Sequence, residues 1–355
     1  MAATTAPQGG FAVVTVVALW MALSVAASNL GKLALSRFPF PLTISLVRFG
    51  LAAGLVGLGQ FLASSRPPAT LASTAARCWQ WGLGLGLAGL TTNVASRMAV
   101  QHISVSFANT AKASQPLFSA LLSWLVLRQV FSRATLYALA AVAAGVGLSA
   151  ATEFRFSWLG FALAELSVLG NVAGSVFQKL LLGMSRGGGG SGGGSSGLDK
   201  QSLFFVTNAY SLLLLLPVWS LSDEPRALLA LAHAGRFAPE VPSKSALPLE
   251  AASAGASAVA VLVLAALLAE AGQHFVSLTV LALVSPTSHA ITSSCKRVVV
   301  IAASLLFWRN PVSALNGAGI ALALGGVALY ERTTRHPDKA AAGPGAASGG
   351  GQHLT

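Results

Sequence analysis

Charged side chains are scarce in this chain of 355 residues, of which only 9% are Asp, Glu, Lys or Arg. An average soluble domain has roughly 25%, so the composition excludes a soluble enzyme. Acidic residues are the rarest of the charged ones, 10 against 22 Lys and Arg, which gives a net charge of +12. Cysteine is nearly absent as well, since Cys78 and Cys295 are the only two. They provide neither a disulfide framework nor metal-site spacing, and no cofactor or metal is expected.

Apolar residues take the place of the missing charges and make up 54% of the chain. A membrane-spanning helix needs about 20 predominantly apolar residues, and the chain has runs of this kind. We therefore predict an all-α polytopic membrane protein with ten transmembrane helices. We expect membrane lipid to surround the protein. The basic residues do not indicate a nucleic-acid partner, because many of them lie inside the apolar runs. The ten runs are 11–34, 41–64, 79–101, 103–127, 132–151, 158–183, 201–221, 254–283, 286–308 and 311–330.

The segments between the runs divide the chain into four parts. Residues 1–183 form an N-terminal five-helix repeat plus helix six, and residues 201–331 form helices seven to ten. Between them lies a Gly/Ser-rich linker at 184–200, whose composition is typical of a flexible coil. A polar tail at 332–355 is expected to be disordered. The segment from Ser222 to Glu250 is acidic and proline-containing, and we expect it to be exposed.

The N-terminus and the loop charges bear on location and orientation. No Lys or Arg precedes the first run, so neither a signal peptide nor a transit peptide is indicated. This favours the endomembrane system, Golgi or ER, with the plastid envelope as the alternative. The loops on the side of both termini hold nine Lys and Arg against six opposite, which predicts that both termini are cytosolic.

An internal repeat relates the two halves of the chain. The stretch from Ile103 to Leu148 matches the stretch from Val284 to Leu329 position by position without a gap, and Gly145-Val146 meets Gly326-Val327. Equivalent positions are five helices apart, so the second half enters the membrane in the opposite sense. Two inverted five-helix repeats are typical of secondary transporters, which bind substrate near the midplane between them.

Ionisable residues inside the apolar runs indicate where the chemistry lies, because each costs at least about 2.5 kcal/mol at the bilayer centre. Lys32, Arg97 and Lys179 are near run ends, where long side chains reach the headgroups. Structural pairing is the favoured role for Arg48, Glu165 and Glu270.

Tryptophans near run ends, including Trp20 and Trp308, indicate an aromatic belt. Glycines at 82–89 indicate a helix-packing surface.

Lys112, Lys296 and Arg297 lie too deep in their runs for their side chains to reach the headgroups. Lys112 lies about nine residues into its run and Lys296 about ten, so at about 1.5 Å per residue both are roughly 14 Å from the surface of a core about 30 Å thick. A guanidinium fork and point-charge ammonium groups together suit a phosphoryl group. We predict that this trio binds phosphate or a carboxylate, with purely structural ion pairs as the alternative.

Several of these stretches resemble the sugar-phosphate/phosphate translocators, the triose-phosphate transporter family of the drug/metabolite transporter superfamily. The resemblance covers nearly the whole chain. It is carried by the stretches Val284 to His289, Cys295 to Ile301, Pro311 to Ser313, Gly325 to Tyr330, Ile103 to Phe107, Lys112 to Pro116, Thr152 to Phe161, and Asn29 and Lys32 with Phe38 to Pro41.

The resemblance implies an antiporter that exchanges a phosphorylated sugar or related organic phosphate for phosphate by alternating access. It also implies that Lys112, Lys296 and Arg297 hold the phosphate. Three further substrate contacts depart from the family pattern: the helix-three His and Thr positions fall on Asn93 and Ser96, and a helix-eight Tyr position falls on Gln273.

Other functions stay open at this point. A nucleotide-sugar/nucleoside-monophosphate antiporter is the first alternative, because phosphate recognition is better supported than recognition of a particular sugar. A non-transporting membrane scaffold or receptor is the second, although it would need no cations at the midplane. An enzyme is not expected, since no nucleophile, base and orienting group recur at a suitable spacing.

Overall fold

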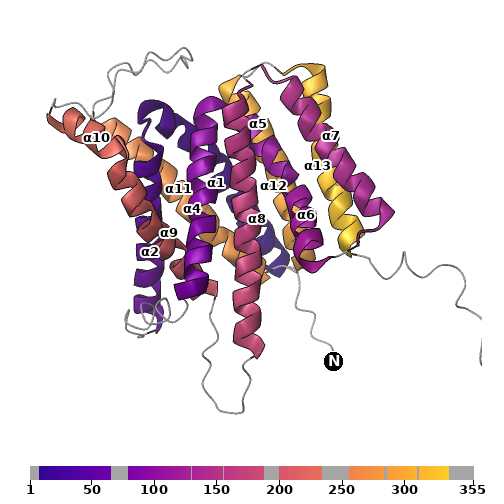
Figure 1. Ribbon diagram of the computed structural model, residues 1–355, viewed down its shortest axis with the longest axis horizontal. Coiled ribbons are helices and arrows are strands. Elements are labelled where there is room, and N and C mark those ends of the chain that lie inside the picture. The colour runs from indigo at the N-terminus through magenta and orange to yellow at the C-terminus, as the bar shows by residue number, and fades with distance from the viewer. Residues whose placement is uncertain are drawn as a thin grey trace, which may run out of the picture.

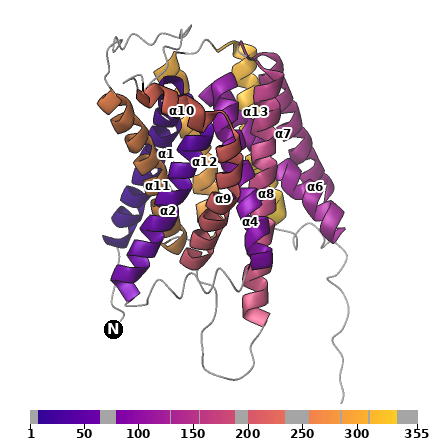
Figure 2. The same cartoon turned by 60° about the vertical axis from the view of Figure 1, so that its left-hand side comes forward.

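The computed structural model describes residues 8–64, 79–128, 130–154, 156–187, 200–233, 256–283, 286–309 and 312–335. Regular secondary structure in these ranges is helical throughout, and the long helices run side by side across one bundle (Figures 1 and 2). The helices are α1 (Gln8–Arg37), α2 (Pro41–Ser64), α4 (Trp79–His102), α5 (Val105–Ala111), η1 (Lys112–Ser114), α6 (Gln115–Leu127), α7 (Arg133–Ala151), α8 (Trp158–Gly187), α9 (Lys200–Leu221), α10 (Glu224–His233), α11 (Ala256–Leu283), α12 (Pro286–Trp308) and α13 (Ala314–Arg335).

The largest differences between the helices and the sequence prediction are four. The predicted run 103–127 is divided into α5, the short 3₁₀ turn η1 and α6. Helix α10 forms within the segment that was expected to be an exposed loop. Helix α8 continues to Gly187, into the predicted linker, and α13 continues to Arg335, into the predicted tail. The rest of the linker, 188–199, and of the tail, 336–355, lies outside the described residues.

Seven helices are long and apolar enough to cross a membrane, namely α1, α2, α7, α8, α9, α11 and α13. This confirms a polytopic, all-α membrane protein. Among the described helices, α4, α6 and α12 fall outside that set. Helix α6 has only 13 residues, short of the roughly 17 that a span requires, whereas α4 and α12 contain Arg97 and Lys296-Arg297.

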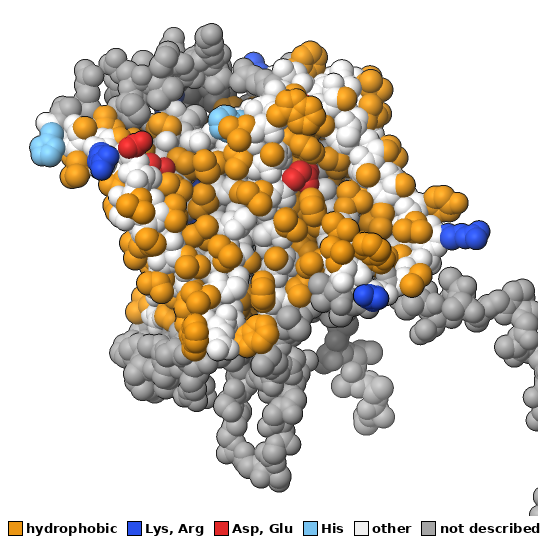
Figure 3. Space-filling model, viewed as in Figure 1, with side chains coloured by type: hydrophobic (Ala, Val, Ile, Leu, Met, Phe, Trp, Pro, Cys, Tyr) orange, Lys and Arg blue, Asp and Glu red, His pale blue; other side chains and the backbone are white. Residues whose placement is uncertain are grey.

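The surface is that of a protein surrounded by lipid. Hydrophobic side chains cover most of the face in Figure 3, and the Lys and Arg side chains on that face lie at its margins. Large apolar side chains such as Trp124 and Leu306 are exposed, whereas polar ones such as Asn29, Thr110 and Asn208 are buried. Polar groups are hidden and apolar groups displayed, which fits a hydrocarbon solvent.

Glycines let α4 approach α9 closely, as the sequence predicted for 82–89. A Cβ placed on Gly86 would lie 2.8 Å from the backbone carbonyl carbon of Tyr210. Ser211 uses this proximity, because its hydroxyl donates to the Gly86 carbonyl at 2.9 Å. In membranes, helix association depends on such close packing of small residues.

We expect Gly86→Ala to lower the melting temperature of the detergent-solubilised protein, because the new methyl group would overlap the α9 backbone. Overpacking of this kind typically costs about 1–3 kcal/mol. Gly147→Ala in α7 is the matched control, since a Cβ there has no atom within 4 Å. Differential scanning fluorimetry of both variants checks this, and equal melting temperatures would contradict the packing role of Gly86.

Helices α7 and α13 meet through reciprocal contacts. A Cβ on Gly145 would meet the backbone nitrogen of Ala323, and a Cβ on Gly326 would lie 2.8 Å from the backbone nitrogen of Val142. Gly145 and Gly326 occupy equivalent positions of the internal repeat, and so do Val142 and Ala323. The same contact is therefore made twice, in the manner of an interface with two-fold symmetry.

The turns before these two helices also match. Arg128 and Arg309, which are equivalent in the repeat as well, have positive φ angles of 50° and 47°. Ser132 and Ser313 then act as N-caps, each accepting a hydrogen bond from the amide three residues on, at 3.2 and 3.1 Å. An N-cap hydroxyl satisfies one of the unpaired amides of a helix start. The described residues of the two turns therefore share their local geometry.

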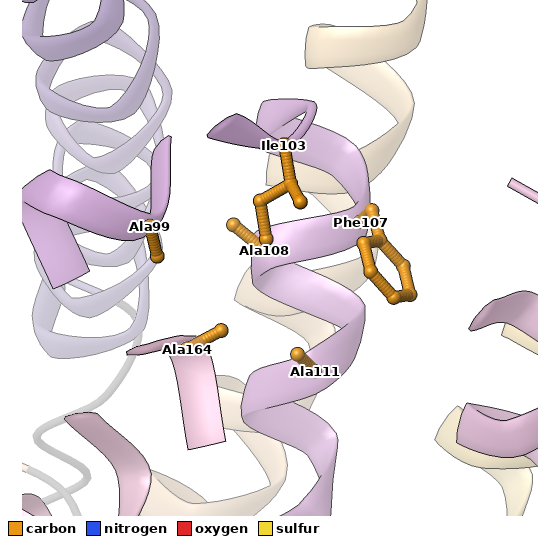
Figure 4. Close-up of a cluster of buried hydrophobic side chains, with 6 residues drawn as sticks. All are labelled: Ala99, Ile103, Phe107, Ala108, Ala111 and Ala164. Atoms are coloured by element: carbon orange, nitrogen blue, oxygen red, sulfur yellow. The ribbon is translucent and has the colours of Figure 1, made fainter. Parts of the chain in front are cut away.

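A cluster of small and apolar side chains fixes α5 between α4 and α8. Four of its six members are alanines, whose small side chains allow close packing, and Phe107 lies on the side of α5 away from Ala99 and Ala164 (Figure 4). The cluster positions the chain just before η1, where the predicted helix is interrupted. Its buried members are Ala99, Ile103, Phe107, Ala108, Ala111 and Ala164.

Candidate anion-binding site

A cavity of about 470 Å³ lies inside the bundle, and α1, α4, α5, η1, α6, α8, α11 and α12 contribute to its lining. All six residues predicted from the sequence line it. They come from four separate elements, so the fold gathers residues that are far apart along the chain. The six are Asn93 and Ser96 of α4, Lys112 of η1, Gln273 of α11, and Lys296 and Arg297 of α12.

The position of Lys112 follows from the proline four residues after it. Pro116 has no N–H, so it cannot make the helical hydrogen bond to the Lys112 carbonyl. The chain tightens instead into a 3₁₀ turn, in which the Gln115 amide bonds that carbonyl. The carbonyl can accept a second bond, and the Arg297 guanidinium donates to it at 3.0 Å. Pro116 was the available sequence signal for this interruption.

Arg297 joins α12 to this interruption by two hydrogen bonds. Besides the bond to the Lys112 carbonyl, its Nη2 donates to Oε1 of Gln115 at 2.7 Å. Both acceptors are neutral oxygen atoms. A phosphoryl oxygen carries negative charge and is a stronger acceptor for a guanidinium than an amide oxygen, so it could replace Gln115.

Lys296 faces an aromatic ring. Its ammonium lies 4.4 Å from the centroid of the Trp20 ring, and Trp20 is only 2% exposed. The prediction that Trp20 belongs to an interfacial belt is therefore wrong. A cation over the face of Trp is attracted by the ring quadrupole, which holds Lys296 without neutralising its charge.

Lys32 and Trp308 form a similar pair. The Trp308 ring lies 5.5 Å from the Lys32 ammonium, and its Nε1 donates to the Asn29 side chain at 2.9 Å. Lys32 also donates to the carbonyl of Ile103 at 2.8 Å. Lys32 was predicted to extend to the headgroups, and this is wrong, because the side chain points into the protein. The side chain of Lys179 lies outside the described part.

Glu270 links three helices through two ion pairs. Its Oε1 lies 2.6 Å from Nε of Arg48 and its Oε2 lies 2.6 Å from Nη2 of Arg97. Structural pairing of Arg48 and Glu270 is confirmed, whereas the prediction that Arg97 reaches the headgroups is wrong. Arg48 also contacts Nε2 of His274 at 3.2 Å, and a guanidinium only donates, so that nitrogen accepts. Sequence reasoning missed His274, although it lies one helical turn after Glu270.

Positive charge exceeds negative charge around the cavity. Among the described residues that line it, five are Lys or Arg and one, Glu270, is acidic. An excess of cations over acids at membrane depth requires water or an anionic ligand nearby. The five are Lys32, Arg97, Lys112, Lys296 and Arg297.

Two other carboxylates support α5 and η1 at either end. Ser114 of η1 donates to Glu165 of α8 at 2.7 Å, so Glu165 pairs with a hydroxyl group rather than with a cation. Ser104, the N-cap of α5, donates to Glu153 at 2.8 Å. Glu153 lies beyond the spanning helices, where burial raises the pKa of its carboxyl group and the hydrogen bond from Ser104 opposes that shift.

The model of the Triose-phosphate Transporter family matches residues 11–331. The chain belongs to this family. The resemblance in the sequence motifs predicted this membership, and the match confirms it over nearly the whole chain.

Several named phosphate translocators are similar to most of this chain. Phosphoenolpyruvate/phosphate translocator 3, chloroplastic, of Oryza sativa subsp. japonica is 32% identical over 320 residues, which cover 90% of this chain and 74% of that protein. Triose phosphate/phosphate translocator, non-green plastid, chloroplastic, of Brassica oleracea var. botrytis is 30% identical, with 90% and 72% covered. Triose phosphate/phosphate translocator, chloroplastic, of Solanum tuberosum is 26% identical, with 88% and 68% covered.

Proposed function

We propose that this protein is an antiporter that exchanges a phosphorylated sugar or related organic phosphate for phosphate by alternating access. The observation that carries the proposal is the cavity with five cations and one acid among its described lining residues. The names of the relatives, which are phosphate translocators, support it. Lys112, Lys296 and Arg297 bind the phosphate in this proposal, and Asn93, Ser96 and Gln273 contact the remainder of the substrate.

The two halves are proposed to be inverted repeats of five transmembrane helices each. Support comes from the contacts that recur between equivalent positions of the repeat, Gly145 with Ala323 and Val142 with Gly326. The matching positive φ angles of Arg128 and Arg309 add to it. Inverted repeats that move against each other give alternating access around a fixed central site.

Charge explains why exchange is obligatory in this proposal. When the site is empty, several cations face each other in a membrane interior without compensation. Closing such a site removes the cations from water, which costs free energy. A bound phosphate dianion compensates two positive charges, so the loaded protein changes conformation more readily than the empty one. Net uptake without a counter-substrate should therefore be slow.

The proposal is tested by uptake of labelled phosphate into proteoliposomes preloaded with different counter-substrates. The panel contains inorganic phosphate, a triose phosphate, phosphoenolpyruvate and a nucleoside monophosphate, with unloaded vesicles as the control. Rapid uptake against at least one phosphorylated three-carbon compound supports the proposal. Uptake of a labelled nucleotide sugar only into vesicles loaded with the nucleoside monophosphate would support the alternative antiporter. Phosphate uptake that does not depend on what the vesicles contain would contradict obligatory exchange.

Location and orientation stay predictions. The sequence favoured the endomembrane system with both termini cytosolic, whereas the relatives above are named as chloroplastic. A fluorescent fusion, viewed beside plastid-envelope and Golgi markers, distinguishes the two locations. Protease accessibility of a tag at either terminus, measured in intact organelles, tests the orientation.

Gln273 occupies a position where the family pattern has a Tyr. We expect this difference to change the substrate selectivity of the protein. Tyr offers a rigid ring and one hydroxyl group, whereas Gln offers a donor and an acceptor on a flexible stem. Gln273→Tyr should therefore change the ranking of triose phosphate against larger phosphates, with a smaller effect on exchange of phosphate for phosphate. Exchange rates of the variant with each counter-substrate check this. An unchanged ranking would place Gln273 outside the site.

A further inference from the structure

A second cavity of about 170 Å³ adjoins the central one. Its own lining includes Ser119 of α6 and Tyr330 and Glu331 of α13, and we refer to it as the vestibule. Gln115 and Arg297 line both the vestibule and the central cavity, as does Ser293. The wall between the two spaces is therefore made by a few side chains.

The vestibule lies on the side of the bundle where the described chain begins and ends. Tyr330 and Glu331 belong to the last turns of α13, which ends at Arg335. The start of α1 lies at the same end of the bundle in both ribbon views (Figures 1 and 2). A solute that enters from this side through the vestibule meets the shared wall before it reaches the central cavity.

Two hydrogen bonds from Arg297 of α12 to the interrupted helix hold this wall together. Arg297 donates to the Gln115 side chain at 2.7 Å, and its other bond, to the Lys112 carbonyl at 3.0 Å, fixes the guanidinium in place. The carbonyl belongs to the backbone, but the Gln115 side chain can rotate away. Gln115 is therefore the part of the wall that can open.

We propose that the hydrogen bond between Arg297 and Gln115 is a gate between the vestibule and the central cavity. A phosphoryl group opens it by replacing the Gln115 oxygen as the acceptor of the guanidinium. Bonds to a charged acceptor are roughly twice as strong as those to a neutral one, so phosphate displaces the amide whereas an uncharged sugar does not. This proposal rests on phosphate being the transported group and assigns Gln115 a role in admitting it.

The charges on the two sides of the gate give the passage a direction. The described lining of the vestibule has one acid, Glu331, and one cation, Arg297, whereas that of the central cavity has five cations and one acid. An anion is therefore held more strongly once it has passed Gln115. Opening the gate and binding at the central site use the same guanidinium.

The test uses cysteines on either side of the gate, in a Cys78→Ser, Cys295→Ser background. Ser28→Cys reports on the central cavity, because Ser28 lines that space, and Ser119→Cys reports on the vestibule. A membrane-impermeant thiol reagent is added to the terminal side of vesicles that have been sorted by an accessible C-terminal tag. Each cysteine is combined with Gln115, Gln115→Ala, Gln115→Leu or Gln115→Glu.

We expect Gln115→Ala and Gln115→Leu to accelerate labelling of Ser28→Cys roughly fivefold, as loss of an ordinary hydrogen bond would. Gln115→Glu keeps an acceptor at the same reach, so labelling should stay slow. Labelling of Ser119→Cys should be equal in all four. Three results would overturn the gate. They are equal labelling rates of Ser28→Cys in all four proteins, no labelling of Ser28→Cys in any of them, or a parallel acceleration of labelling at Ser119→Cys.

Protection by inorganic phosphate tests the identity of the opening group. If phosphate displaces Gln115, half-protection of Ser28→Cys should require roughly fivefold less phosphate in Gln115→Ala, because the competing acceptor is gone. An unchanged or raised concentration would contradict displacement. Thiol labelling does not require transport, so failure of the gate proposal does not affect the result of the exchange assay. Failure of the proposed antiport function is detected by the exchange assay itself.

Discussion

Glu270→Ala should destabilise the protein more than any other single substitution considered above. Glu270 lies between Arg48 and Arg97, whose side chains are only 8% and 11% exposed. Removing the carboxylate leaves two buried guanidinium groups without their counter-ion. Breaking a buried pair in this way typically costs about 3–5 kcal/mol. We expect a melting temperature in detergent that is lower by several degrees, with loss of the monodisperse peak in gel filtration.

A matched control separates burial from the loss of a carboxylate. Asp223 and Arg226 also form an ion pair, at 3.9 Å, but their side chains are 100% and 87% exposed. Exposed pairs contribute little, so Asp223→Ala should leave the melting temperature unchanged. Glu270→Gln retains the shape and one acceptor and should fall between the two. Equal melting temperatures for Glu270→Ala and Asp223→Ala would show that the two arginines find other partners.

The sequence located most of the long helices because their signal is local. A bilayer imposes a minimum length and apolarity on each spanning segment, and both can be read from a window of neighbouring residues. The depth of Lys112, Lys296 and Arg297 along their runs is also a local quantity, and all three line one cavity. The interruption at η1 was missed, although Pro116 marks it.

The partners of the other cations could not be predicted in the same way. Distance from a helix end says how far a side chain must reach to leave the membrane, but not which way it points. Arg97 points inward to a carboxylate 173 residues away, and Lys32 to a carbonyl 71 residues away. Trp20 was misassigned for the same reason, since burial depends on which helix packs against it. These contacts depend on tertiary packing.

Loss of exchange is the expected result of Lys112→Ala and of Arg297→Ala, each with the protein still inserted and folded. A buried charge-assisted contact is worth about 1.5–3 kcal/mol, so losing one weakens phosphate binding at least tenfold. Arg297→Ala has a second consequence, because it also removes the bonds from α12 to the Lys112 carbonyl and to Gln115. We therefore expect the larger loss for Arg297→Ala, and Arg297→Lys should not restore exchange, since an ammonium lacks the planar fork.

The measurement is phosphate self-exchange in proteoliposomes, normalised to the amount of protein that elutes as a monodisperse peak. Arg226→Ala is the matched control, because it removes a cation at a side chain that is 87% exposed and does not line the cavity. It should exchange at the parent rate. Raising the phosphate concentration should recover part of the rate in Lys112→Ala, because that variant loses affinity but keeps the Arg297 bonds. Near-normal exchange by a well-folded Lys112→Ala or Arg297→Ala protein would mean that the phosphate binds elsewhere.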